Sequence, residues 1–324
     1  MRKLLLASIA FVISSLQAQD YWCLDKRLSV RADYGYLRRQ EVRNLRLVED
    51  TSQTGGNGKP KKRIEADELV DLFGWESAIR GILTYHGSAC SSLEAQYTYF
   101  YPWSSKIEKT ADGTLQFPFK DPIITFDFTE ADEAVVRYKS RLQNGELNYW
   151  WHITPQRVNY FSFSWNIGLR LIFLKETLDL VFKKDENKSL YAIETNNYLY
   201  GPQLGAVLEI NPSSCWTWTF IVKGAAFLND SHNEVEIGDF DNTEKFRDYE
   251  KMRWTDSLLI EGYGQLAYHW YSWLDLHFAY QGFLLTGLVL APEQRDIHVS
   301  EKRRINTKGQ ILIDGLYGGL TLRF

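Results

Sequence analysis

One stretch of this sequence, residues 161–173, alternates between apolar and polar side chains without interruption, and this period of two constrains the fold most. Phe161, Phe163, Trp165, Ile167, Leu169, Leu171 and Phe173 share one face, and Ser162, Ser164, Asn166, Gly168 and Arg170 share the other. Successive side chains of a β-strand point to opposite faces, so the segment predicts a strand with one wholly apolar surface.

The same alternation recurs along the rest of the chain. Its apolar members are Leu28, Val30, Ala32, Tyr34 and Tyr36; Trp75, Ile79, Leu83 and Tyr85; Leu93, Ala95, Tyr97, Tyr99 and Tyr101; Val136, Tyr138 and Leu142, continued past a predicted bulge at Asn144-Gly145 by Leu147, Tyr149 and Trp151; Leu204, Ala206, Leu208 and Ile210; Trp216, Trp218, Phe220 and Val222; Leu258, Ile260, Leu266 and Tyr268; Leu274, Leu276, Phe278 and Tyr280; and Leu312, Leu316, Leu320, Leu322 and Phe324. About ten strands are therefore predicted.

A membrane-spanning β-barrel leaves this signature, because one face of each strand meets lipid and the other faces the lumen. Aromatic residues make up 15% of the chain, with 11 Trp and 19 Tyr, and they cluster near the strand ends where interfacial belts form. A soluble sandwich also alternates, but its buried faces rarely keep Trp and Phe this dense. We predict an all-β, antiparallel barrel of the bacterial outer membrane, ending in Phe324 as a lipid-facing assembly signal.

The connections alternate between short and long. Short ones are expected at 86–92, 153–157, 211–214 and around Tyr271, and long ones at 39–73, 102–132, 175–189, 229–251 and 289–307. Short periplasmic turns and long external loops are typical of such barrels. Residues 115–117 and 123–126 could add a hairpin, so twelve strands is the alternative.

The N-terminus reads as a secretory signal peptide over residues 1–18, with cleavage expected after Ala18. Residues 19–324 would then form the barrel. Loss of Arg2 and Lys3 with the signal takes the net charge from −4 to −6, which gives no reason to propose nucleic-acid binding. No later apolar run reaches the ~20 residues that a spanning helix needs.

Charged residues of both signs lie on the predicted lumen face. The candidates for a lumen constriction are Arg31, Asp33, Glu76, Arg80, Glu94, Arg137, Lys139, Arg141, Arg170, Lys223, Glu261 and Asp275. They could form a salt-bridged filling, because charges cut off from bulk water must pair, or a polar filter for solutes.

Other groups of residues give weaker functional predictions. His232, Asp239, Asp241 and Asp256 could serve an outer-membrane protease of the ten-stranded kind, although their spacing fits no catalytic motif. His269 and His277 flank a short connection and would more often be structural than metal ligands. The basic loop at 57–63 could meet lipopolysaccharide phosphates. Export permits a disulfide, for which Cys23 with Cys90 is the predicted pair, leaving Cys215 free.

Three segments, Asn197–Ala206, Gly287–Gln294 and Ile305–Gly319, resemble the β-barrel porin family 7 known from planctomycetes. The resemblance covers the chain from Arg137 onward, and a looser one links it to Legionella-type major outer-membrane proteins. It implies an outer-membrane barrel presumed to be a pore, and it supplies no catalytic residues.

The sequence therefore predicts a non-enzymatic barrel without cofactor or bound metal, and a narrow porin-like channel for small polar solutes. The alternative is a structural or adhesin-like surface protein with a plugged lumen, and an omptin-like protease is a third possibility. Expected partners are outer-membrane lipids and lipopolysaccharide, the barrel-assembly machinery and small solutes. The oligomeric state stays open.

Overall fold

The computed structural model describes residues 27–40, 43–54, 60–88, 90–120, 128–154, 160–239, 245–297 and 304–324. Its elements are β1 (Leu28–Gln40), β2 (Arg46–Thr54), β3 (Pro60–Glu65), α2 (Ala66–Asp71), β4 (Trp75–Ser88), β5 (Ser91–Phe100), β6 (Trp103–Gln116), β7 (Ala131–His152), β8 (Phe161–Lys184), β9 (Asn187–Ser213), β10 (Trp216–Asp239), β11 (Lys245–Tyr271), β12 (Leu274–Leu288), η2 (Ala291–Gln294) and β13 (Gly309–Arg323). Among these residues no helix is long and apolar enough to cross a membrane.

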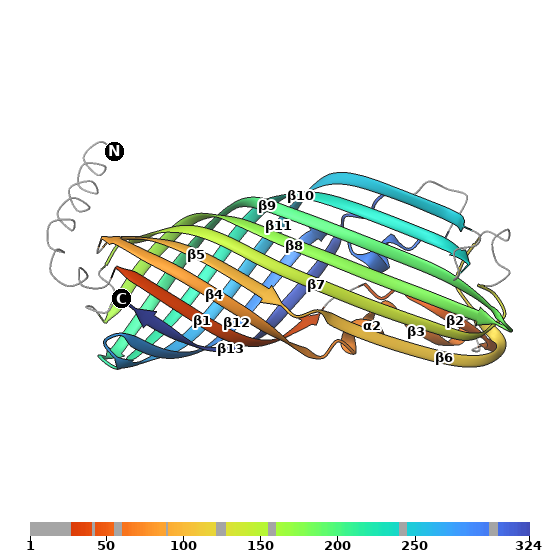
Figure 1. The fold of residues 1–324 in the computed structure, drawn as a ribbon, viewed down its shortest axis with the longest axis horizontal. Helices are drawn as coiled ribbons and strands as arrows, with labels where there is room; N and C mark the ends of the chain where they lie inside the picture. The colour runs from red at the N-terminus through yellow and green to blue at the C-terminus, as the bar shows by residue number, and fades with distance from the viewer. Residues whose placement is uncertain are drawn as a thin grey trace.

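Ten antiparallel members close into a ring, in the order β1, β4, β5, β7, β8, β9, β10, β11, β12, β13 and back to β1 (Figure 1). The closing seam pairs β1 with β13, from Ser29 opposite Arg323 to Gln40 opposite Leu312. Phe324 and Leu28 exchange backbone hydrogen bonds of 2.8 and 3.3 Å, so both ends of the barrel chain lie at one rim. This rim also holds the short turns and is the periplasmic end. The predicted fold is confirmed.

β5 and β6 together form one member of the ring. Both pair with β7, with Tyr99 opposite Gln143 and Trp103 opposite Ser140, so β5–β6 carries one extra residue between these pairs. Pro102 lies in this bulge, where its missing N–H costs no ladder hydrogen bond. Residues 115 and 116, which could have begun an additional hairpin, instead end β6. Residues 121–127 lie outside the described part.

The barrel exterior carries the predicted apolar faces. Phe161, Ile167, Leu169 and Leu171 are 47–61% exposed on β8, and β9, β10 and β11 continue the band. Exposed aromatic side chains border it on both sides. The periplasmic belt comprises Trp151, Phe161, Trp216, Trp270, Tyr271 and Trp273, and the outer belt Tyr36, Trp75, Tyr101, Tyr198, Trp254 and Tyr280. An apolar band between two aromatic girdles places the cylinder in a bilayer.

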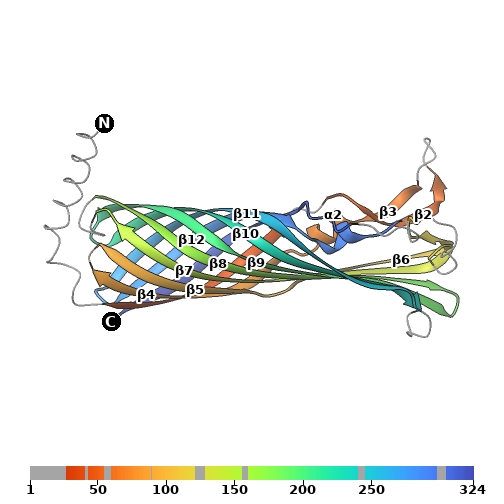
Figure 2. The same cartoon turned by 90° about the horizontal axis from the view of Figure 1, so that it is seen from above.

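The strands differ greatly in length, which gives the barrel an uneven top. β1, β4, β12 and β13 have 13–15 residues, whereas β7–β11 have 22–27. The long strands continue past the outer belt as a tall curved sheet (Figures 1 and 2). We call this part the stem; it comprises residues 103–116, 131–142, 174–184, 187–197, 229–239 and 245–253. Most of the segments 175–189 and 229–251 that were predicted as loops are therefore strand.

The apolar phase of each long strand inverts where the strand leaves the membrane. On β8 the odd residues up to Leu171 meet lipid, whereas in the stem the even residues Leu174, Leu178 and Phe182 are fully buried. No bulge causes this change, because β8 pairs with β7 in unbroken register from Ser164 to Lys183. The inversion arises because lipid lies outside the membrane cylinder, while the only apolar environment of the stem lies inside it.

The predicted bulge at Asn144-Gly145 is therefore wrong. β7 runs straight through, and its buried residues are even-numbered from Ala134 to its end at His152. Arg137, Lys139 and Arg141, which were expected in the lumen, consequently lie on the outer face of the stem.

Two connections fill the inside of the stem. Residues 43–54 and 60–74 form the β2–β3 hairpin and α2, and residues 289–297 and 304–308 form the β12–β13 connection with η2. We call these residues together the plug. Its side chains Leu47, Ile64, Leu69, Phe73 and Leu290 belong to one buried core with the inward faces of β7–β10. Figure 2 shows the plug lying against one face of the tall sheet.

Candidate functional site

The membrane part of the lumen contains a first cluster of ion pairs around Asp33 on β1. The Nε atoms of Arg31 and Arg80 donate to its two carboxylate oxygens over 2.9 and 2.7 Å, and His277 on β12 contacts it from the other side. Arg80 also donates to the Tyr263 hydroxyl over 3.0 Å. Asp33, Arg80 and His277 are buried, so the cluster links β1, β4, β11 and β12 across the barrel interior.

A second cluster surrounds Glu146 on β7. Lys223 Nζ donates to its carboxylate over 2.7 Å, Asn144 over 3.0 Å, and Arg170 approaches to 3.5 Å. Arg170 also pairs with Glu261 on β11. All four charged side chains are at most 5% exposed, and they meet from β7, β8, β10 and β11. Sequence reasoning missed Glu146, because the expected bulge obscured which residues of β7 face inward.

The remaining lumen candidates lie nearer the strand ends. Glu94 accepts a hydrogen bond of 3.1 Å from Asn148, and Glu76 is partly buried near the outer end of β4. Asp275 contacts His269 Nδ1 at 2.8 Å and pairs with Arg323. His269 and His277 thus each contact a different aspartate. Within the described ranges, no group of three or more His, Cys, Asp or Glu side chains could hold a metal ion.

Polar cavities lie between these clusters and the periplasmic rim. One of about 190 Å³ reaches His86, Ser92 and His152 near the short turns, and one of about 70 Å³ ends at Arg80 and Lys223. Both are lined by Arg31, Glu94, Trp150 and Ile221. Solvent-sized space therefore extends from the periplasmic half of the lumen toward its middle.

At the outer mouth, Glu176 of β8 connects the barrel wall to the plug. Its carboxylate accepts hydrogen bonds from the backbone N–H of Ala291 over 3.0 Å and from the Tyr138 hydroxyl over 2.9 Å, and it pairs with Arg39 at 2.6 Å. Burial raises the pKa of Tyr138 well above its usual value, so its hydroxyl stays a donor. Four structural elements therefore meet at one fully buried carboxylate.

Asn197 on β9 holds the same connection through its side-chain amide. Its Nδ2 donates to the Val289 carbonyl over 2.8 Å, and its Oδ1 accepts from the Val289 N–H over 2.9 Å. Further along the plug, burial raises the pKa of Glu293, and the charge of Arg43, 3.7 Å from its carboxylate, partly lowers it again. No pattern in the sequence linked Glu176 or Asn197 to a connection about a hundred residues away.

The protease candidates do not converge on the mouth. His232 lies on the outward face of β10, between Asp230 at 3.5 Å and Glu250 at 3.4 Å, and Asp256 is exposed on β11 four register positions away. Asp239 is near the far end of β10. Asp241 lies outside the described residues.

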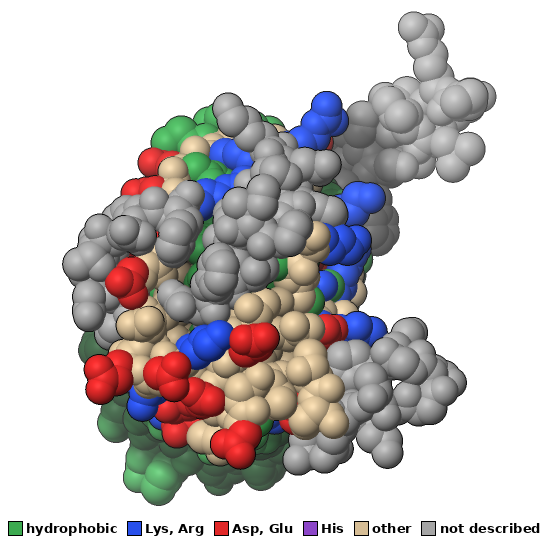
Figure 3. Space-filling model, turned by 90° about the vertical axis from the view of Figure 1, so that its right-hand side faces the viewer, with side chains coloured by type: hydrophobic (Ala, Val, Ile, Leu, Met, Phe, Trp, Pro, Cys, Tyr) green, Lys and Arg blue, Asp and Glu red, His purple; other side chains and the backbone are tan. Residues whose placement is uncertain are grey.

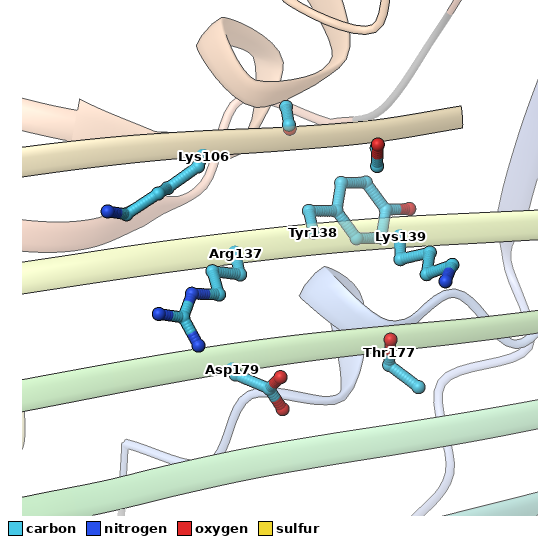
Figure 4. A pocket seen from close by; sticks show the side chains of 8 residues that line it. Lys106, Arg137, Tyr138, Lys139, Thr177 and Asp179 are labelled. Atoms are coloured by element: carbon cyan, nitrogen blue, oxygen red, sulfur yellow. The ribbon is translucent and has the colours of Figure 1, made fainter. Parts of the chain in front are cut away.

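Two of the three outward cations of β7, Arg137 and Lys139, line a surface depression instead. A cavity of about 400 Å³ is lined by residues of β6, β7 and β8, among them Lys106, Arg137, Lys139, Thr177 and Asp179 (Figure 4). At the outer tip of the stem, by contrast, acidic and basic side chains are interspersed (Figure 3).

Other predicted sites have mixed outcomes. Phe324 is 62% exposed beside the periplasmic rim, on the lipid side as expected. Cys215 is an exposed free thiol. Cys23 and the signal peptide lie outside the described residues, so the predicted Cys23–Cys90 disulfide stays a prediction. The side chains of the basic loop at 57–63 are likewise outside the described part.

Comparison with known proteins supports the fold and goes no further. No family model and no curated protein matches the sequence. The crystal structure of the outer-membrane protease OmpT from Escherichia coli superposes with a TM-score of 0.50 at 12% identity, covering 92% of this chain and 97% of that one. The translocator domain of the autotransporter NalP from Neisseria meningitidis gives a TM-score of 0.39 at 5% identity, covering 100% and 96%.

The apolar band, its two aromatic girdles and the closed antiparallel ring define the class. The protein is an outer-membrane β-barrel of ten strands. Within this class it is one whose wall continues as a stem above the membrane.

Proposed function

We propose that this protein is a plugged barrel that acts at the cell surface through its stem, as a structural or surface-interaction protein. The observation that carries the proposal is a double closure. Ion pairs bridge the lumen at the level of Asp33 and Glu146, and the plug packs an apolar core into the stem above them. We also propose that the protein is non-enzymatic, and that membrane lipids, lipopolysaccharide and the barrel-assembly machinery are its partners.

The energetics favour a closed state. Each buried charge of the Glu146 cluster is compensated by a partner, and separating one partner from a buried pair costs about 3–5 kcal/mol. Moving the plug out of the stem would also expose Leu47, Leu69 and Leu290, at about 1.5–3 kcal/mol for each buried apolar side chain. Thermal fluctuation alone would therefore rarely open both closures together.

Conductance in planar lipid bilayers tests the proposal. The refolded wild-type barrel should show no steady single-channel steps. A variant that carries Asp33→Ala, Arg80→Ala, Glu146→Ala and Arg170→Ala, and has residues 44–73 and 290–306 each replaced by a short Gly/Ser linker, should conduct, because both ion-pair clusters and both parts of the plug are removed. Circular dichroism confirms that each barrel has refolded. Steady wild-type steps would overturn the proposal.

A narrow channel for small polar solutes is the second candidate, and the cavities of about 190 and 70 Å³ in the periplasmic half favour it. Charges of both signs line them, as in a polar filter. The resemblance to β-barrel porin family 7 points the same way. Transport would require the plug to leave the stem, so this candidate predicts wild-type conductance that rises when the plug is removed.

A further inference from the structure

The outward face of β7 changes character as the strand leaves the membrane. From the periplasmic side it carries Trp151, Tyr149 and Leu147, then Gly145 and Gln143, and then three cations in succession. These are Arg141, Lys139 and Arg137. All three belong to the stem and point away from the lumen, so no solute inside the barrel can touch them.

Their height above the bilayer follows from strand geometry. Arg141 lies ten residues from Trp151 in the periplasmic belt. At 3.3 Å per residue and a strand tilt of about 40°, this distance spans about 25 Å, the thickness of the apolar band of such barrels. Arg141 is therefore at the outer boundary of the hydrocarbon, and Lys139 and Arg137 lie about 5 and 10 Å above it, among the headgroups of the outer leaflet.

Glu108 and Asp179 attract Arg137, but neither comes into direct contact with it. Arg137, Lys139 and Arg141 form no hydrogen bond or ion pair with any residue in the described ranges, whereas the neighbouring Lys106 on β6 pairs with Glu108 at 2.7 Å. We call these four basic residues the cationic patch. Asp179 lies opposite Arg137 on β8 and offsets part of its charge. The patch keeps a positive surplus beside the depression of about 400 Å³ (Figure 4).

Cations outnumber acidic residues around the depression on the β6–β8 side of the stem, where Lys106, Arg137, Lys139 and Arg141 lie with Glu108 and Asp179. At the same levels on the opposite side, the outward residues of β10 and β11 are acidic and exposed, including Glu234, Asp248 and Glu250. The sidedness indicates an anionic partner on the β6–β8 side.

We propose that the cationic patch binds the phosphate groups of lipopolysaccharide in the outer leaflet. Arginine forms paired hydrogen bonds with phosphate oxygens and lysine supplies a compact charge, so the residue types fit this ligand. The position fits as well, because the depression faces sideways into the headgroup layer. The lipid chains would then lie against the apolar surface of β7 and β8 below. The inference does not depend on whether the lumen conducts.

Binding of purified lipopolysaccharide to the refolded barrel in nanodiscs of neutral phospholipid tests this site. Wild-type protein is compared with Lys139→Gln and with the double variant Lys139→Gln/Arg141→Gln. Lys183→Gln is the matched control, because Lys183 lies on the same outward sheet face but six register positions above the level of Lys139, about 15 Å higher. Dephosphorylated lipopolysaccharide and inorganic phosphate are tested in parallel.

Wild type and Lys183→Gln should bind phosphorylated lipopolysaccharide equally. The single variant should weaken binding about fivefold and the double variant about 30-fold, at roughly fivefold per cation near an anionic surface. Dephosphorylated lipopolysaccharide should bind about as weakly to wild type as intact lipopolysaccharide does to the double variant. Equal binding of both lipid forms, or unchanged binding by the double variant, would overturn the proposal. So would full competition by millimolar inorganic phosphate, which would reveal a free-anion site.

Discussion

Removing the charge of Glu176 should release the plug from the barrel wall. Glu176→Gln keeps the shape of the side chain but leaves the guanidinium of Arg39, which is fully buried, without its counter-ion. Breaking a buried ion pair in this way costs about 3–5 kcal/mol. The Ala291 N–H also loses a charged acceptor. The free energy of plug opening should fall by this amount, so the equilibrium constant for opening should rise about 150- to 5,000-fold.

Hydrogen exchange measures this opening directly. The backbone amides of Val289 and Ala291 both donate to wall side chains, so they exchange only when the plug leaves. Their exchange in Glu176→Gln should accelerate by that factor, while amides of the membrane strands stay unchanged. Glu194→Gln is the control, because Glu194 is also a stem carboxylate paired with a cation but lies on the outward face, where such pairs contribute at most about 1 kcal/mol.

The double variant Arg39→Met/Glu176→Met decides whether the buried charge is the cause. Two apolar side chains leave no uncompensated ion, so the double variant should lose much less protection than the sum of the two single variants. Additive effects, or a change of less than tenfold in Glu176→Gln, would refute the reasoning. The plug would then be held by its apolar contacts rather than by the Glu176 anchor.

Three further outcomes follow from the described contacts. Glu146→Gln should lower barrel stability by about 3–5 kcal/mol in urea refolding with vesicles, because Arg170 and Lys223 lose a shared counter-ion; a change below 1 kcal/mol would contradict this. Because burial raises the pKa of Glu293, its protonated form favours the docked plug, so docking should be strongest below about pH 4.5 and weaken as the pH rises through the raised pKa. Exchange corrected for intrinsic rates tests this between pH 4 and 8, and pH-independent protection would exclude it. Ile260→Arg on the lipid face should cost about 2–4 kcal/mol in the same refolding assay, and a neutral effect would place that residue outside the bilayer.

Sequence reasoning succeeded wherever lipid is the apolar environment. The alternation of 161–173, the final strand and the short turns each predicted their elements correctly, because apolar side chains in the membrane must point outward. Clusters of Trp and Tyr likewise marked both edges of the band. These features depend on local sequence and on one rule about the bilayer.

The stem could not be recognised by that rule. There the apolar residues of β7, such as Val136 and Leu142, pack inward against the plug, so their phase is opposite to that of Leu147 and Trp151. If every apolar residue of β7 is taken to face lipid, a bulge at Asn144-Gly145 is needed, and Arg137, Lys139 and Arg141 are placed in the lumen. The position of the phase change instead marks the outer edge of the membrane on each long strand.

The contacts of the plug could not be predicted from the sequence, for a different reason. Leu47 and Leu290 come from connections 243 residues apart, and their environment exists only after the ring has closed. Polar anchors such as Glu176 and Asn197 look like ordinary strand residues until their partners are known. Most inward charges of the membrane part, by contrast, were found from alternation alone.

β7–β11 run from the membrane cylinder into the stem as unbroken strands, which has a mechanical consequence. β9 extends eleven residues from Tyr198 in the outer belt to Asn187, about 36 Å along the strand. The hydrogen-bonded ladders of β7–β10 continue from the membrane into the stem, so the stem is a rigid extension of the barrel wall rather than a flexible loop. A partner bound at the tip of the stem would transmit force to the barrel through these strands. A tilt of the stem above the saccharide layer would therefore tilt the barrel down to its periplasmic rim.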